Sequence, residues 1–164
     1  MGLFYSSSKL YAESIAYFGD LLQFMIPAYA LGMSVNEKDI EGTKQMVYSY
    51  GTTQIIVHAV KMIVSEERPD GSNHHSFPSG HTASAFSGAS FIHHRYGLSQ
   101  AAIPYGLALF VGFSRVYARR HYTHDVLAGA MISSLVSYFM VDKYVDITIE
   151  MNQNKKEIGF IYRF

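Results

Sequence analysis

The chain has 164 residues, which is enough for one domain and too short for two. Thirteen Lys and Arg residues balance thirteen Asp and Glu residues, so the net charge is zero and nothing indicates a nucleic-acid partner. The absence of cysteine excludes disulfides and thiolate metal sites. A mean hydropathy of +0.06 is low for a protein that is nearly all membrane span, so composition alone leaves a soluble and a membrane protein open.

Apolar runs separated by polar turns predict five helices in chain order. We expect helices over residues 9–33, 39–65, 80–95, 100–118 and 123–143. Pro27 is expected to kink the first of them, and Pro104 lies in the first turns of the fourth. The tail, 145–164, has strand-like alternation around Ile158 to Tyr162 and no chemistry that we can name.

Four of these segments are about long enough to cross a hydrocarbon core of roughly 30 Å. The segment 80–95 is shorter and rich in Ala, Ser and Gly, which allows close helix contact as in membrane bundles. The predicted fold is therefore all-α, a transmembrane bundle of about five to six helices. We expect it to be a single domain over 1–164.

Three short stretches carry the polar residues of a phosphate site, and two of them flank the loop 66–79. Lys61 and Arg68 are two helical turns apart and share a face, and Pro69 discourages helix at Arg68 and beyond. Ser79 is a plausible N-cap for the third helix, and Gly80 lets the backbone approach a ligand closely. The backbone N–H groups and the positive end of that helix would then bind an anion.

The third stretch begins at Ser114-Arg115 and continues to His121 and Asp125. Because His121 and Asp125 are four residues apart, a helix would place them on one face, one turn from each other. A carboxylate there accepts the imidazole N–H and fixes its tautomer, the role that Asp has in a hydrolase triad. Arg115 adds a planar fork that suits two phosphate oxygens. The spacing predicts that the three stretches converge on one phosphoryl group.

Together the stretches read K-x6-RP, PSGH and SR-x5-H-x3-D, and they resemble the signature of the type-2 phosphatidic acid phosphatase and vanadium haloperoxidase superfamily. The resemblance covers about residues 45–142 and implies that superfamily's helical fold. It implies that His121 is the nucleophile and forms a phosphohistidine, that Asp125 orients it, and that His81 protonates the leaving oxygen. It assigns phosphate binding to Lys61, Arg68, Ser79, Gly80 and Arg115, with Ser114 in support.

Two features depart from the family pattern. Only eight residues separate Pro69 from Pro78, so the lid over the site is expected to be short. Membrane members of the family usually have six spans, whereas the sequence predicts five segments, so the amino-terminal region is expected to be abbreviated. We predict no cleavable signal peptide, because Met1 to Ser8 lacks a basic n-region.

The distribution of basic residues predicts the orientation in a membrane. The surface opposite the motifs receives an excess of basic residues, namely Lys38, Lys44, Arg95, Lys143, Lys155, Lys156 and Arg163. The positive-inside rule makes that surface cytoplasmic. The expected location is the inner, cytoplasmic membrane, with several spans and the active site facing the periplasm or exterior.

Other polar residues have open interpretations. Arg119 and Arg120 either contact a lipid head group or form a solvated charge pair. His74 and His75 fit ordinary loop residues better than substrate recognition. His58 fits a bundle histidine with its polar atoms satisfied, and the stretch from His93 to Arg95 fits an ordinary helix end.

The predicted function is hydrolysis of a phosphomonoester or pyrophosphate on a membrane lipid, with no metal and no cofactor because fixed cations take the place of a metal. Candidate substrates are phosphatidic acid, phosphatidylglycerophosphate, undecaprenyl pyrophosphate and the phosphates of lipid A. The first alternative is a soluble acid phosphatase or a vanadate-dependent haloperoxidase. A second is a metal-dependent hydrolase that uses His74, His75, His81 and His121. A third is a non-catalytic lipid-phosphate binder or transporter.

Overall fold

The computed structural model describes residues 2–152 and 155–162, and the side chains of residues 10–144. Its elements are α1 (Gly2–Asn36), α2 (Ile40–Ile63), α3 (Gly80–Tyr96), α4 (Leu98–Tyr117), α5 (Thr123–Met140), β1 (Val145–Asn152) and β2 (Lys155–Tyr162). The five predicted helices are confirmed. α1 is longer than predicted at both ends, and α2 ends two residues early because Val64 is already extended, with φ −99° and ψ 102°.

α3 lies at the centre of the bundle and contacts each of the other four helices. Its small residues explain how: a Cβ atom on Gly88 would lie 2.7 Å from the backbone nitrogen of Pro27 on α1. On the other side, a Cβ on Gly129 of α5 would lie 2.5 Å from the carbonyl oxygen of Ser79. Real Cβ atoms do not approach so closely, so these glycines allow two backbones to pack against α3 at short range.

The outer faces of the bundle carry large apolar side chains. Exposed examples from four helices are Phe24, Ile55, Leu109 and Phe139. Within the described residues, one helical segment, Leu10–Asn36, is both long and apolar enough to cross a membrane, and only 28% of its most apolar window is buried. A helix that packed inside a soluble core would bury most of that window, so this apolar surface faces outward.

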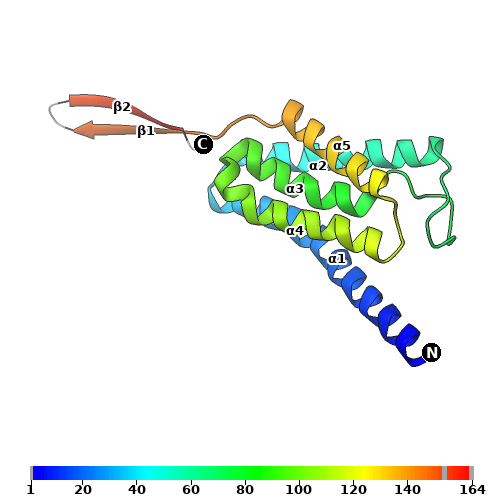
Figure 1. Ribbon diagram of the computed structural model, residues 1–164. Coiled ribbons are helices and arrows are strands. Elements are labelled where there is room, and N and C mark those ends of the chain that lie inside the picture. The colour runs from blue at the N-terminus through cyan, green and yellow to red at the C-terminus, as the bar shows by residue number, and fades with distance from the viewer. Residues whose placement is uncertain (1, 153–154, 163–164) are drawn as a thin grey trace.

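The two ends of the bundle differ in what they carry (Figure 1). The loop between α2 and α3 and the turn between α4 and α5 lie at one end. From the other end the β1–β2 hairpin extends away from the helices, with Val145 paired to Tyr162 and Asn152 to Lys155. The strand pattern predicted for the tail is confirmed, and the hairpin contacts none of the five helices.

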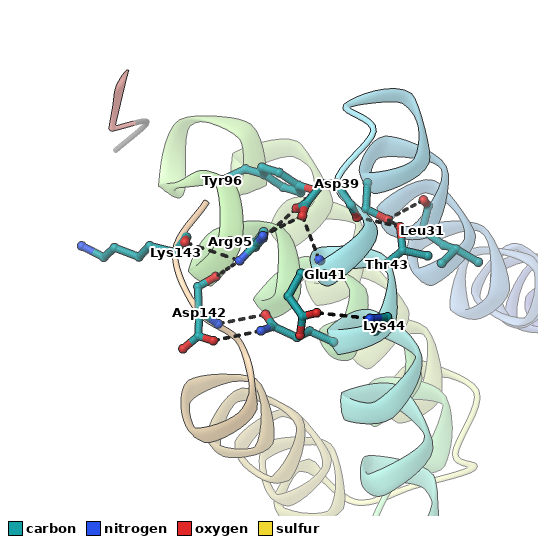
Figure 2. Close-up of polar contacts among 12 residues, drawn as sticks. Leu31, Asp39, Glu41, Thr43, Lys44, Arg95, Tyr96, Asp142 and Lys143 are labelled. Atoms are coloured by element: carbon teal, nitrogen blue, oxygen red, sulfur yellow. Dashed lines mark hydrogen bonds and ion pairs between the residues drawn. The ribbon is translucent and has the colours of Figure 1, made fainter. Parts of the chain in front are cut away.

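A buried ion pair joins two elements at the hairpin end of the bundle (Figure 2). Arg95 donates from Nε to Asp39 Oδ2 at 2.7 Å and from Nη2 to Oδ1 at 2.6 Å. Asp39 also accepts hydrogen bonds from the Tyr96 hydroxyl at 2.8 Å and from the Gly42 backbone at 2.8 Å. The prediction that Arg95 ends a helix in an ordinary way was wrong, because this side chain is buried and joins α3 to the α1–α2 turn.

Candidate active site

The predicted phosphate-site residues meet at the end of the bundle opposite the hairpin. Ser79 caps α3 as predicted: its Oγ accepts from the backbone N–H of Thr82 at 3.4 Å. The Ser79 backbone N–H in turn donates to the carbonyl of Asp125 at 2.9 Å, which joins the start of α3 to the start of α5. Gly80 faces Lys61, since a Cβ on Gly80 would lie 4.0 Å from Lys61 Cε. The N-terminus of α3 and the cationic side chain of Lys61 therefore lie at the same place, and both favour an anion there.

His121 and Asp125 form the predicted pair and are both buried. Asp125 Oδ2 lies 3.2 Å from His121 Nδ1 and also accepts from the Tyr122 backbone at 2.9 Å. A third donor, the hydroxyl of Ser76 in the loop before α3, lies 2.5 Å away. Ser76 is a residue that the sequence did not single out, because its partner is 49 positions away and nothing local marks the contact. The carboxylate fixes the Nδ1–H tautomer and leaves Nε2 of His121 with a free lone pair.

The surroundings of His121 keep its imidazole neutral. Burial, together with the nearby charges of Arg68 and Lys61, lowers the pKa of His121 to about 4, against the opposing attraction of Asp125. A neutral imidazole is the nucleophilic form. In the empty site at neutral pH, His121 therefore has the protonation state that attack on phosphorus needs.

Lys61 and Arg68 approach the site from the end of α2 and from the loop that follows. Lys61 Nζ donates to the carbonyls of His75 at 2.9 Å and Ser76 at 3.2 Å, which leaves one of its three donors free for a ligand. Arg68 Nε is buried and has no hydrogen-bond partner among the described residues. A buried guanidinium nitrogen without a partner is costly unless an anion occupies the site.

Arg115, the third cation, is nearly fully buried and held on three sides. Its Nε donates to Ser114 Oγ at 3.0 Å, its Nη1 to Asp20 Oδ1 at 2.6 Å, and its Nη2 to the Ala16 carbonyl. Ser114 is fully buried and also bonds the Val111 carbonyl, so its hydroxyl orients Arg115.

Asp20 of α1 is the site residue that the sequence interpretation missed. Its Oδ1 lies 2.9 Å from Nε2 of His81 as well as 2.6 Å from Arg115 Nη1. The sequence did hold a signal: Asp20 is the single charged residue between Glu13 and Glu37, within an apolar helix. Ionisable groups in such helices usually serve a site or pair with a partner.

The other histidines stand apart from this centre. His74 and His75 are exposed in the loop. His58, which was predicted to be a bundle histidine with its polar atoms satisfied, is instead exposed on α2. The four histidines of the metal-hydrolase alternative are thus not gathered. In the described part of the chain, Glu66, His124 and Asp125 are the one group with metal-ligand geometry, and they already pair with one another.

Arg119 and Arg120 lie at the mouth of the site. Arg119 Nη2 donates to the Pro69 carbonyl at 3.1 Å, and Arg120 lies 3.7 Å from the carboxylate of Asp70. They border a cleft of about 900 Å³ between α1, the short loop and the α4–α5 turn, and Asp20 lies in its wall. The cleft therefore borders the site at Asp20.

Curated relatives match parts of the chain. A lipid A 1-phosphatase of Porphyromonas gingivalis is 42% identical over 84 residues, which are 49% of this chain and 19% of that protein. A lipid A 4'-phosphatase of Helicobacter pylori is 28% identical over 137 residues, 77% of this chain and 69% of that protein. The chain therefore spans about a fifth of the first relative and about two thirds of the second.

Solved structures share the fold. A transmembrane PAP2-type phosphatidylglycerolphosphate phosphatase from Bacillus subtilis superimposes with a TM-score of 0.61 at 25% identity, over 80% of this chain and 74% of that one. LpxE of Aquifex aeolicus superimposes with a TM-score of 0.64 at 24% identity, over 80% and 84% of the two chains. The predicted fold class, a transmembrane helical bundle of the phosphatidic acid phosphatase type, is confirmed.

The sequence profile of the PAP2 superfamily matches residues 42–148, from the start of α2 into β1. That range contains all three motif stretches and leaves out α1, which supplies Asp20. With signature, fold and profile in agreement, the chain belongs to the PAP2 superfamily.

Proposed function

We propose that the protein is a membrane phosphatase that hydrolyses a phosphomonoester or pyrophosphate on a lipid and releases one phosphate through a phosphohistidine at His121. The observation that carries the proposal is the buried His121–Asp125 pair beside Lys61 and the unpartnered Arg68 Nε. A neutral nucleophile among fixed cations is the arrangement that phosphoryl transfer needs. In a purely structural site the positive and negative side chains would balance, whereas Lys61 and Arg68 give this site an excess of positive charge.

The proposed reaction has two steps. Nε2 of His121 attacks phosphorus, the bond from phosphorus to the leaving oxygen breaks, and that oxygen takes a proton from His81. Water then gives a proton to His81 and attacks the phosphohistidine, which releases inorganic phosphate and restores His121. Lys61, Arg68 and Arg115 stabilise the charge on the equatorial oxygens.

The exposed apolar faces of the helices support a lipid substrate over the soluble alternatives. A soluble acid phosphatase would cover these faces with polar side chains, whereas side chains such as Phe24 and Phe139 suit acyl chains. An apolar groove of about 450 Å³ runs between α1 and α4, and Leu22, Met25 and Leu107 are among its lining residues. Among the lining residues on α1, Leu22 is the one closest in sequence to Asp20, so a lipid chain in this groove would have one end toward the site end of the bundle.

The names of the relatives narrow the candidate substrates. Two of them are lipid A phosphatases, and one structural neighbour acts on phosphatidylglycerolphosphate. Phosphatidic acid and undecaprenyl pyrophosphate stay among the candidates. The open cleft beside the short loop supports a bulky head group over a small one.

Phosphate release from purified protein in detergent, measured against these four lipids, tests the proposal. Wild-type protein should release phosphate and form an acid-labile phosphoprotein, and His121→Ala should do neither. His58→Ala is the matched control, since it removes an exposed histidine on α2, and it should behave as wild type. Phosphate release by His121→Ala above a trace of the wild-type rate would overturn the nucleophile assignment.

We also propose that the site faces the periplasm or exterior. Lys38 and Lys44 support this orientation, whereas Arg95 does not, because its charge is neutralised by Asp39. The chain has no native cysteine, so single cysteines at His75 and Lys38 can be labelled with an impermeant reagent on intact cells. Labelling at 75 with protection at 38 is expected, and the reverse would invert the topology.

A further inference from the structure

Two histidines of the site each have one ring nitrogen held by a carboxylate, and the two use opposite nitrogens. His121 meets Asp125 through Nδ1 at 3.2 Å, which leaves Nε2 for phosphorus. His81 meets Asp20 through Nε2 at 2.9 Å, which leaves Nδ1. The Asp20 carboxylate comes from α1, outside the range that the family profile matches.

The packing of α1 against α4 places Asp20 there. A Cβ atom on Gly19 would overlap Ser114 Oγ and lie 2.6 Å from Arg115 Nη2. The backbone of α1 therefore packs directly against the Ser114 side chain and the Arg115 guanidinium. Asp20 follows in sequence and bridges Arg115 and His81 with a single oxygen. α1 is therefore part of the wall of the site.

A carboxylate beside an anionic substrate needs a compensating reason. The Arg115 guanidinium at 2.6 Å neutralises most of the negative charge that Asp20 would otherwise direct at a phosphate. What is left is the contact with His81, where a carboxylate stabilises an imidazolium and restricts the ring to one orientation. The geometry thus suits the histidine that must carry a proton and not the one that must lack it.

We propose that Asp20 is the positioning residue for the proton donor: it holds Nε2 of His81 so that Nδ1 delivers the proton to the leaving oxygen. This inference rests on the phosphatase function proposed above. The step needs His81 with both ring nitrogens protonated, a form that Asp20 and the negative charge of a bound phosphate favour together. As the bond from phosphorus to oxygen breaks, the Nδ1 proton passes to that oxygen, the product leaves as an alcohol, and His81 is left neutral with its remaining proton on Nε2. Asp20 keeps its negative charge throughout, and water later returns a proton to Nδ1.

The test compares leaving groups that differ in their need for a proton. An alkyl phosphate expels a basic alkoxide and depends on the donor, whereas a nitroaryl phosphate of matched chain length expels a stable phenolate and does not. Asp20→Asn should lower kcat for the alkyl phosphate about 10- to 100-fold and for the nitroaryl phosphate less than about threefold, with little change in KM. Asp20→Glu should recover part of the lost kcat, and Glu67→Gln, an exposed acid at the same end of the bundle, should match wild type.

The outcomes separate the alternatives. Equal losses on both substrates with a raised KM would overturn the inference, because Asp20 would then act only by holding Arg115 for phosphate binding. A gain in kcat/KM for Asp20→Asn would also overturn it, since the carboxylate would then be competing with phosphate. If wild type releases phosphate from both substrates and Asp20→Asn does the same at equal rates, this inference alone fails. If wild type releases none, the proposed function fails with it.

Discussion

Two buried arginines lie at opposite ends of the bundle, and they differ in how completely their surroundings match them. At the hairpin end Arg95 pairs with Asp39, and both oxygens of that carboxylate have two donors each. At the other end Arg115 also pairs with an aspartate, but Lys61 and Arg68 add two more positive charges to the same region. The Arg95–Asp39 pair is balanced in charge and its carboxylate has all its hydrogen bonds, whereas the site end has more cations than its aspartate can neutralise.

The site end also has a charged nitrogen without a partner. Arg68 Nε is buried without a hydrogen-bond partner in the described residues, whereas Asp125 Oδ1 faces His124 Nε2 at 3.1 Å. A buried guanidinium N–H without an acceptor is costly, and an anion bound in the site would supply the acceptor. The saturated Arg95 pair needs no ligand, and its role is to join the α1–α2 turn to α3. A buried arginine can thus serve either structure or ligand binding. Which of the two applies depends on whether the surrounding residues already satisfy all of the hydrogen bonds and charges.

The largest effect on stability is expected at the hairpin end. Arg95→Met would leave the Asp39 carboxylate buried without its ion-pair partner, which costs about 3–5 kcal/mol. Thermal and denaturant unfolding in detergent should report this loss, while kcat per folded molecule stays near that of wild type. Reduced kcat in a variant of unchanged stability would contradict a purely structural role for Arg95.

The matched substitution at the site end, Arg115→Met, should reduce activity strongly and stability only moderately. Arg115→Met removes a cation that would stabilise the phosphoryl oxygens, so kcat/KM should fall about 10²- to 10³-fold. Stability should fall less than for Arg95→Met, because the loss of one charge relieves the repulsion by Arg68 and Arg120. If the two variants lose stability equally and Arg115→Met keeps its activity, the distinction between the two ends is wrong.

Local patterns in the sequence predicted much of this architecture. The PSGH stretch predicted the capped start of α3, and the spacing of His121 and Asp125 predicted their pairing, because both depend on neighbours within four residues. The helix positions followed from apolar runs, and their ends shifted by a few residues. α1 differed most, because three serines, Ser6 to Ser8, interrupt the apolar pattern near its start.

The contacts that sequence interpretation missed are all long-range. Asp20 meets Arg115 across 95 positions, and Arg95 meets Asp39 across 56. Neither distance follows from periodicity, because each depends on how closely two helices pack. The small residues that permit such packing were visible in the sequence, but the register between helices was not.

A smaller effect should appear in the titration of the nucleophile. Repulsion by the Arg68 charge contributes to the low pKa of His121, about 4 in the empty site. Arg68→Met removes that repulsion, which stabilises the imidazolium, so the pKa of His121 should rise by up to about one unit. The acid limb of activity should move to higher pH in the same direction. NMR titration of labelled histidine in the empty enzyme measures the shift, and an unchanged pKa would show that burial, and not the Arg68 charge, sets it.

The smallest effect is expected from an ion pair that looks similar in Figure 2 but is exposed. Lys44 Nζ lies 3.6 Å from Glu41 Oε2, and both side chains are more than half exposed, at 56% and 62%. Water and salt screen such a pair, so Glu41→Gln should change the free energy of unfolding by less than about 0.5 kcal/mol. The same measurement made for Arg95→Met, whose ion pair is buried at the same end of the bundle, provides the scale. A loss of several kcal/mol for Glu41→Gln would mean that proximity to the hairpin end, and not burial with complete partners, determines the stability of this region.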